Sequence, residues 1–310
     1  MKYKKMIFLP AIIGISFSIV LYLSQYSEND YEAIDVNSLI GIEMPQDITS
    51  KKIMLESYIW KNDQNFKTQI PSKIQKFYVD KKFNDFKNVE RIDKIYTKMD
   101  YGVDSTAYMF FPNDPNNELL IYHQGHRGDI VFGKSTIEFF LNKGYTILAF
   151  SMPLTGDNSK PTIHNNELDK KLFLDSHDKF RFLENNDFSP MKFFVEPIYV
   201  SLNYIDSEFD FNSYNFIGIS GGGWTAVVYS ALDDRISKTI SVAGSLPFYL
   251  RTSPENFGDY EQKVPEFYDI ANYLELYIMA SYGPDRGLLQ IFNEFDPCCF
   301  SGTEYVSYEN

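Results

Sequence analysis

A serine framed by glycines is the residue pattern in this chain that is best suited to chemistry. The apolar, β-prone run 215–219 leads into Gly218-Ile219-Ser220-Gly221-Gly222, and small and apolar residues suited to a helix follow. A serine on a tight strand-to-helix turn exposes its hydroxyl and can act as a nucleophile. Glycines at 218 and 222 suit such a turn, since side chains there would collide with the neighbouring strand or helix. The pattern predicts Ser220 as a nucleophile.

The elements around that serine decide how specific the pattern is. The bare motif is weak, and its confirming context is a strand, a turn and a helix in that order. The run 215–219 supplies the strand and 225–232 the helix, and a short polar link leads to a second β-prone run, 238–244. These segments predict one βαβ unit of a parallel sheet. The alternative is a glycine-rich helix start that binds an anion or only turns the chain.

The segments before the serine form a recognisable order. They are a hairpin of 89–99 and 104–111, a strand at 118–123, a helix at 135–142, a strand at 145–150 and a helix at 190–205. With the serine turn, this order resembles the α/β-hydrolase superfamily over about residues 89–300, in particular esterases of the acetyl-xylan-esterase and dienelactone-hydrolase kind. The resemblance implies an α/β fold with a mostly parallel sheet and helices on both faces. It also implies hydrolysis of a carboxylic ester through an acyl-enzyme on Ser220.

The same resemblance gives roles to the residues near the serine. Gly221 matches the residue whose backbone N–H points at the developing oxyanion. The second donor comes from the loop after the strand at 118–123, where Gln124, Gly125 and His126 are candidates. His126 and Arg127 are also candidates for contact with substrate. A bracing role is expected for His123, and Asp129 is expected to cap the following helix.

The acid and the base of a catalytic triad are harder to place. Asp296 follows the last predicted strand, 288–292, and matches the acid, with Glu294 as the alternative. All four histidines precede Ser220, although the expected order is serine, acid, histidine. Either the chain is a C-terminally truncated copy of a hydrolase, or a histidine from an insertion at 155–189 serves instead. Truncation is the simpler explanation. The insertion contains His164 and His177.

The N-terminal segment predicts a membrane anchor. Lys2, Lys4 and Lys5 precede an apolar run from Met6 to Leu23, which is near the minimum length for a transmembrane helix. The basic flank would stay in the cytoplasm and place the catalytic domain outside it. A cleaved signal peptide is the alternative. The predicted domains are an anchor or signal at 1–24, a stalk or elaboration at 25–86, and an incomplete hydrolase domain at 87–310 with a lid at about 155–189.

Composition excludes several classes of partner. The net charge of −13 argues against a nucleic-acid partner. No motif for a metal or a nucleotide occurs, so no cofactor is expected. The two cysteines, Cys298 and Cys299, are neighbours and are expected to be packing residues, because a disulfide between neighbours closes a strained ring. The expected substrate is a small-molecule or glycan ester. An inactive binding protein and a peptidase or thioesterase of the same fold are the alternatives.

Overall fold

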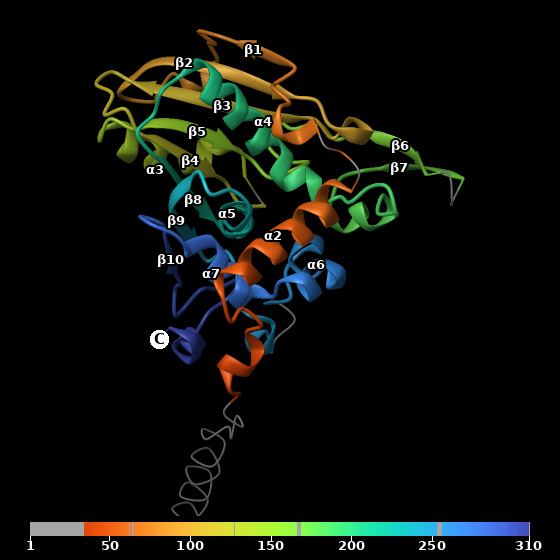
Figure 1. The fold of residues 1–310 in the computed structure, drawn as a ribbon. Helices are drawn as coiled ribbons and strands as arrows, with labels where there is room; N and C mark the ends of the chain where they lie inside the picture. Colours follow the sequence, from red (N-terminus) through yellow and green to blue (C-terminus); the bar gives the residue numbers. More distant parts are fainter. Residues whose placement is uncertain are drawn as a thin grey trace, which may run out of the picture. The chain divides into compact units, whose positions relative to one another are not determined.

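A mixed sheet is the centre of this protein. The computed structural model describes residues 34–61, 63, 65–126, 128–165, 169–252 and 256–309, and one compact unit runs from Ile40 to Asn310. Within the described residues the main sheet has the strand order β1-β2-β3-β5-β4-β8-β9-β10 (Figure 1). The strands are β1 (Lys73–Gln75), β2 (Val89–Thr97), β3 (Ser105–Pro112), β4 (Leu119–His123), β5 (Thr146–Phe150), β8 (Tyr214–Ile219), β9 (Ile236–Val242) and β10 (Gly287–Ile291). Strands β5 to β10 of this order are parallel, while β1, β2 and β3 are antiparallel to their neighbours.

Helices cover both faces of the sheet. They are α2 (Pro45–Trp60), α3 (Lys134–Leu141), α4 (Lys192–Glu208), α5 (Gly221–Leu232), α6 (Pro265–Ile270) and α7 (Tyr273–Ser281). Ile137 of α3 packs with Tyr122 of β4 on one face. Tyr229 of α5 packs on Phe216 of β8 on the other, with ring centroids 6.0 Å apart. Every residue of β4 and β5 is buried, as expected for parallel strands covered on both sides.

Most predicted elements are confirmed. The structure contains the hairpin β2–β3, the strands β4 and β5, the helices α3 and α4, and the β8–α5–β9 unit. The segment 155–189 differs from its prediction as a loop without strands. It contains a small antiparallel hairpin, β6 (Thr162–Asn165) and β7 (Lys170–Phe173), followed by the 3₁₀ helix η6 (His177–Phe182). These strands were missed because they are only four residues long and β7 begins with two exposed lysines, which leaves no apolar alternation to recognise.

Residues 40–86, predicted as part of a stalk, lie in the same compact unit as the sheet. Strand β1 extends the sheet by antiparallel pairing with β2, where Ile74 is opposite Ile95. Helix α2 buries Leu55 and Ile59. Its Lys51 Nζ lies 3.1 Å from Glu275 Oε2 of α7. These contacts join the segment to the sheet and its helices.

The prediction of a transmembrane helix before the sheet is wrong on the findings from the described residues. None of their helices is both long and apolar enough to cross a membrane. The longest, α4, has 17 residues and includes charged side chains, whereas a span needs about 20 apolar residues. The fold class is corrected to a mixed α/β sheet, and the membrane partner and single-pass location are not supported. Residues 6–23 themselves lie outside the described residues.

Candidate functional site

Ser220 occupies the turn between β8 and α5. Its backbone has φ 54° and ψ −126°, a conformation that costs free energy for a residue with a side chain. Two hydrogen bonds hold the turn: Ser220 N–H donates to Val242 O at 2.8 Å, and Trp224 N–H donates to Ser220 O at 3.0 Å. Its side chain is partly buried, and its Oγ forms no hydrogen bond with any residue that the structure describes. The strand, turn and helix expected around this serine are therefore present.

Two glycines make the turn possible. A Cβ added at Gly218 would lie 2.0 Å from the carbonyl oxygen of Gly222, and one added at Gly222 would lie 2.1 Å from the carbonyl oxygen of His123. Both distances are far below van der Waals contact, so no side chain fits at either position. Their absence lets the start of α5 approach β4 and β8, which brings Ser220 to the carboxyl end of the parallel strands.

The loop after β4 lies against the serine. A Cβ at Gly125 would be 2.8 Å from Ser220 Cβ and 3.4 Å from Ser220 Oγ. The Gln124 N–H donates to Phe150 O at 2.9 Å, so it is not free for an oxyanion. In the described part of the chain, the N–H groups of Gly221, Gly125 and His126 have no such acceptor. Arg127 lies outside the described residues.

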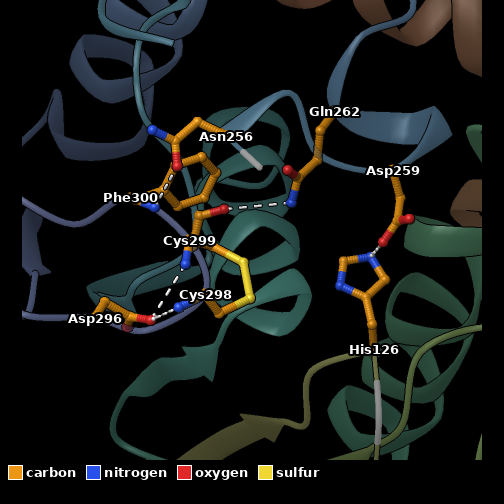
Figure 2. Close-up of a disulfide and its surroundings, with 9 residues drawn as sticks. His126, Asn256, Asp259, Gln262, Asp296, Cys298, Cys299 and Phe300 are labelled. Carbon is orange, nitrogen blue, oxygen red and sulfur yellow. Dashed lines mark hydrogen bonds and ion pairs between the residues drawn. A yellow bond between two sulfur atoms is a disulfide. The ribbon is translucent and has the colours of Figure 1, made fainter. Parts of the chain in front are cut away.

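Asp296 is directed at its own loop. Its Oδ1 accepts hydrogen bonds from Cys298 N–H at 2.9 Å and Cys299 N–H at 3.2 Å. Figure 2 shows it separated from His126, which pairs with Asp259 instead. No histidine in the described residues contacts Asp296. The two cysteines are joined by a disulfide, with an S–S distance of 2.11 Å, so the expectation that they are unpaired packing residues is wrong.

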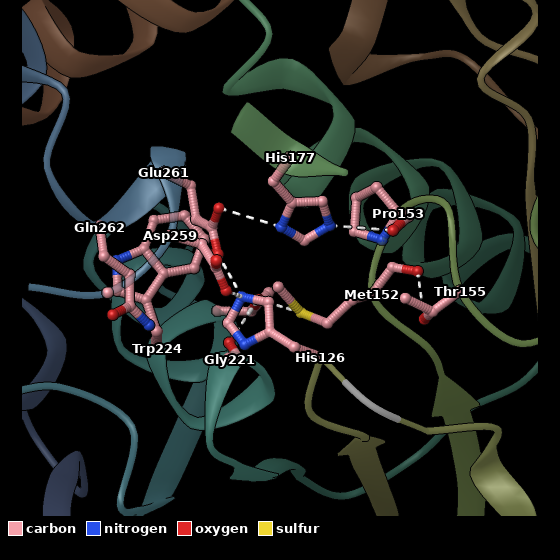
Figure 3. Close-up of polar contacts among 12 residues, drawn as sticks. His126, Met152, Pro153, Thr155, His177, Gly221, Trp224, Asp259, Glu261 and Gln262 are labelled. Atoms are coloured by element: carbon pink, nitrogen blue, oxygen red, sulfur yellow. Dashed lines mark hydrogen bonds and ion pairs between the residues drawn. The ribbon is translucent and has the colours of Figure 1, made fainter. Parts of the chain in front are cut away.

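A partly buried group of two histidines and two carboxylates lies beside the turn at Ser220; we call His126, His177, Asp259 and Glu261 the histidine cluster (Figure 3). His126 Nε2 lies 2.6 Å from Glu261 Oε1 and 2.9 Å from Asp259 Oδ2. His177 Nδ1 lies 3.0 Å from Glu261 Oε2, and its Nε2 lies 2.9 Å from Pro153 O. Glu261 thus connects the two rings.

The cluster is held together by charge. Burial alone would raise the pKa of Glu261, but the adjacent His177 and His126 outweigh burial and hold it well below its usual range. Burial would lower the pKa of His126, whereas its hydrogen bonds to Asp259 and Glu261 raise it to about 10. The hydrogen bond from His126 lowers the pKa of Asp259. With this raised pKa the His126 ring is a cation at neutral pH.

The His126 ring rests on the residue after the serine. A Cβ at Gly221 would lie 2.4 Å from His126 Cε1 and 2.6 Å from its Nδ1. This Nδ1 forms no hydrogen bond with the described residues, whereas Nε2 is held by the carboxylates. The Nδ1 of His126 therefore lies beside the turn at Ser220 without a hydrogen bond to the described residues.

The other two histidines have different surroundings. His123 is fully buried, its Nδ1 lies 2.9 Å from Gln124 O, and burial lowers its pKa to about 4. A neutral, buried ring bonded to its own loop agrees with the expected bracing role. His164 is half exposed on β6, 3.4 Å from Asp169. Asp129 Oδ1 accepts from Val131 N–H at 3.1 Å and so caps the short 3₁₀ helix η5 (Ile130–Gly133), whereas α3, the helix it was predicted to cap, begins after Gly133 without a side-chain cap.

Sequence reasoning missed two members of the cluster. Asp259 and Glu261 lie at the start of the 3₁₀ helix η9 (Tyr260–Gln262), in a stretch without a motif or a strong periodicity. His177 was one of two histidines considered in the insertion. The only available signal was therefore the absence of a histidine after Ser220, which pointed to the insertion but to no acid.

Comparisons with known proteins place the fold. No protein-family model and no curated protein sequence matches this chain. Among solved structures, a putative acetyl xylan esterase from Bacteroides fragilis is similar with a TM-score of 0.54 at 14% identity, covering 78% of this chain and 66% of the other. The chain that is compared with it therefore has the α/β-hydrolase fold. Acetyl xylan esterase 1 from Thermoanaerobacterium sp. is similar at a TM-score of 0.49 and 12% identity, over 84% and 88% of the two chains. At 14% identity, the likeness to the Bacteroides fragilis protein shows the fold alone.

Proposed function

We propose that this α/β-hydrolase-fold protein hydrolyses carboxylic esters through an acyl-enzyme on Ser220. The observation that carries the proposal is the strained turn itself. Ser220 is held at φ 54° between β8 and α5, and its hydroxyl is not used by any described residue. Strain of this kind is retained where the surrounding structure fixes it, and it gathers at functional sites.

The transition state needs donors for the oxyanion. Backbone N–H groups aimed at the developing charge are a large source of stabilisation in acyl transfer. The Gly221 N–H is the first donor, because it is at the start of α5 and has no acceptor within the helix. The second donor comes from Gly125 or His126. The side chain of His126, next to both, is in place to contact the substrate.

His126 is the base in this proposal. A serine hydroxyl needs a base within reach, and the base needs a group that orients it. Glu261 and Asp259 hold Nε2, which leaves Nδ1 to take the proton as Ser220 Oγ bonds to the carbonyl carbon. The proton then passes to the leaving alcohol as its C–O bond breaks. Water, deprotonated by the same nitrogen, releases the acid. Since the carboxylates favour the protonated ring, we expect slow turnover at neutral pH.

The substrate class follows from the neighbours with this fold. One of them is the putative acetyl xylan esterase from Bacteroides fragilis. We therefore expect a small acyl group on a glycan or a small-molecule alcohol. Fold alone does not fix the substrate, so the shared fold supports this expectation only by analogy.

A fluorophosphonate probe tests the nucleophile. Wild type and Ser301→Ala, which changes an exposed serine, should be labelled, whereas Ser220→Ala should not. Hydrolysis of p-nitrophenyl acetate should follow the same pattern. Absence of labelling in wild type, or equal labelling of Ser220→Ala, would overturn the proposal. Either result would leave a binding protein on this fold.

A further inference from the structure

The histidine cluster also brings together the kinds of donor atom that hold a metal ion. We propose that His126, His177, Asp259 and Glu261 bind a divalent transition-metal cation, with Zn²⁺ as the best match. Each residue offers one ligand atom, and these four atoms all lie within 4.8 Å of one another. Imidazole nitrogens and carboxylate oxygens are ligands that Zn²⁺ accepts in tetrahedral sites.

The spacing of the ligand atoms suits such an ion. With bonds of about 2.0–2.2 Å to nitrogen and oxygen, the neighbouring ligands of a tetrahedral zinc are about 3.4 Å apart. The three contacts inside the cluster measure 2.6, 2.9 and 3.0 Å. These contacts need to open by less than about 1 Å for zinc to replace the hydrogen bonds, and the widest pairs of ligand atoms, which lie within 4.8 Å, need to close by up to about 1.4 Å. Rotation of the side chains supplies a change of that size.

The hydrogen bond to Pro153 determines which ring nitrogen of His177 carries a hydrogen. A carbonyl oxygen only accepts, so the 2.9 Å contact with Pro153 O places a hydrogen on Nε2. The neutral ring then aims the lone pair of Nδ1 at the carboxylate of Glu261, 3.0 Å away. Two acceptors facing each other need a proton or a cation between them. Metal-bound histidines commonly donate their second N–H to a backbone carbonyl in this way.

The two carboxylates around His126 also need a proton or a cation between them. One Nε2–H faces Glu261 Oε1 and Asp259 Oδ2, and a single hydrogen cannot satisfy two carboxylates fully. When His126 gives up its proton to bind a metal, the cluster is left with two negative charges, one of them on the fully buried Glu261. Buried charge is costly unless it is compensated. A divalent cation compensates both charges at once.

The cluster joins three parts of the chain and remains accessible. His126 comes from the loop after β4, His177 from the insertion, and the two carboxylates from the start of η9 (Figure 3). The side chain of Asp259 is 49% exposed, which gives the ion an entry route. Four protein ligands complete a tetrahedral shell, which is typical of a structural metal rather than a catalytic one. Zinc would therefore hold the insertion and η9 against the turn at Ser220.

Zinc and the proposed base role of His126 exclude each other. A neutral ring that gives Nε2 to the metal keeps its remaining hydrogen on Nδ1, so it cannot take the Ser220 proton. This consequence rests on the proposed function, whereas the metal site does not. Metal binding must therefore be measured directly.

Titration calorimetry with zinc chloride tests the site in the full chain after chelator treatment. Wild type should bind one equivalent, and His177→Gln should bind at least tenfold more weakly. His164→Gln is the matched control, because it removes an exposed histidine that also pairs with a carboxylate, and it should bind as wild type does. Cobalt(II) should give the absorption bands of a tetrahedral site in wild type and lose them in His177→Gln.

Asp259→Asn provides a second variant on a half-exposed side chain, in case His177→Gln does not fold. Circular dichroism checks folding of each variant, and Asp259→Asn should also weaken zinc binding. Equal affinity of wild type and either folded variant, or no stoichiometric binding by wild type, would overturn the site. Labelling of Ser220 in the same samples is read separately, so failure of the metal site and failure of the esterase proposal are distinguishable.

Discussion

Two groups of charged side chains, each containing a buried glutamate, use different partners for their carboxylates. In the histidine cluster, Glu261 lies between two imidazoles. In a second group, which we call the lysine cluster, Lys192 lies 2.9 Å from Asp63, 3.0 Å from Asp100 and 3.8 Å from Glu196. An ammonium carries a permanent charge that occupies the centre of its group. Imidazoles can exchange their protons for a metal, so only the histidine cluster is suited to chemistry or to zinc.

The two glutamates show what the partner decides. Both are almost fully buried. The two histidines keep the pKa of Glu261 well below its usual range in spite of burial. For Glu196, burial outweighs Lys192 and raises the pKa to about 7, and its Oε2 has no hydrogen-bond partner in the described residues. A buried carboxylate is thus ionised where partners reach both oxygens and resists ionisation where a single cation lies farther away.

The largest expected effect separates the two clusters by activity. His126→Gln should lower kcat/KM for p-nitrophenyl acetate by about 10²–10⁴, the usual contribution of a general base. Lys192→Met should leave it unchanged, because the lysine cluster does not contact Ser220. The assay uses protein freed of metal by a chelator. Equal rates for wild type and His126→Gln would remove His126 from the mechanism.

The second prediction concerns the free energy of unfolding and compares the two carboxylates of the histidine cluster. Glu261→Gln leaves His126 without its fully buried partner and should lower the free energy of unfolding by about 3–5 kcal/mol at pH 7. Asp259→Asn changes a half-exposed carboxylate and should cost at most about 1 kcal/mol. Urea unfolding of the metal-free proteins measures both. If Glu261→Gln left the free energy of unfolding unchanged, the cluster would not stabilise the fold.

The last prediction concerns the lysine cluster and the pH dependence of stability. Here the substitution is expected to stabilise the protein at high pH, whereas the preceding ones destabilise it. A raised pKa of Glu196 means that its contribution to stability is complete below about pH 4.5 and is lost as the pH rises through about 7. Glu196→Gln cannot ionise. Its stability relative to wild type should therefore increase by about 3 kcal/mol between pH 4 and pH 8. Urea titrations at a series of pH values measure this change, and a constant difference between the proteins would contradict it.

Local sequence predicted the parts of the fold that neighbouring residues specify. Glycines at 218 and 222 and the flanking runs identified the turn at Ser220, because its sterics act within a few residues. The hairpin β6–β7 was missed because its short, exposed strands carry no apolar alternation. Asp296 suited the acid by its place after the last strand, yet its carboxylate is occupied by the adjacent backbone. Position along the chain did not specify orientation.

The sequence by itself determined the α/β sheet, the strained serine turn and the glycines that allow it. Only the tertiary structure decided which histidine lies beside that turn and which acids hold it. His126 and Glu261 are 135 positions apart, and His177 and Glu261 are 84 apart. Such contacts form when η9 and the insertion pack against the loop after β4. Their distances depend on the whole fold, because no local pattern of residue types encodes a meeting between segments so far apart.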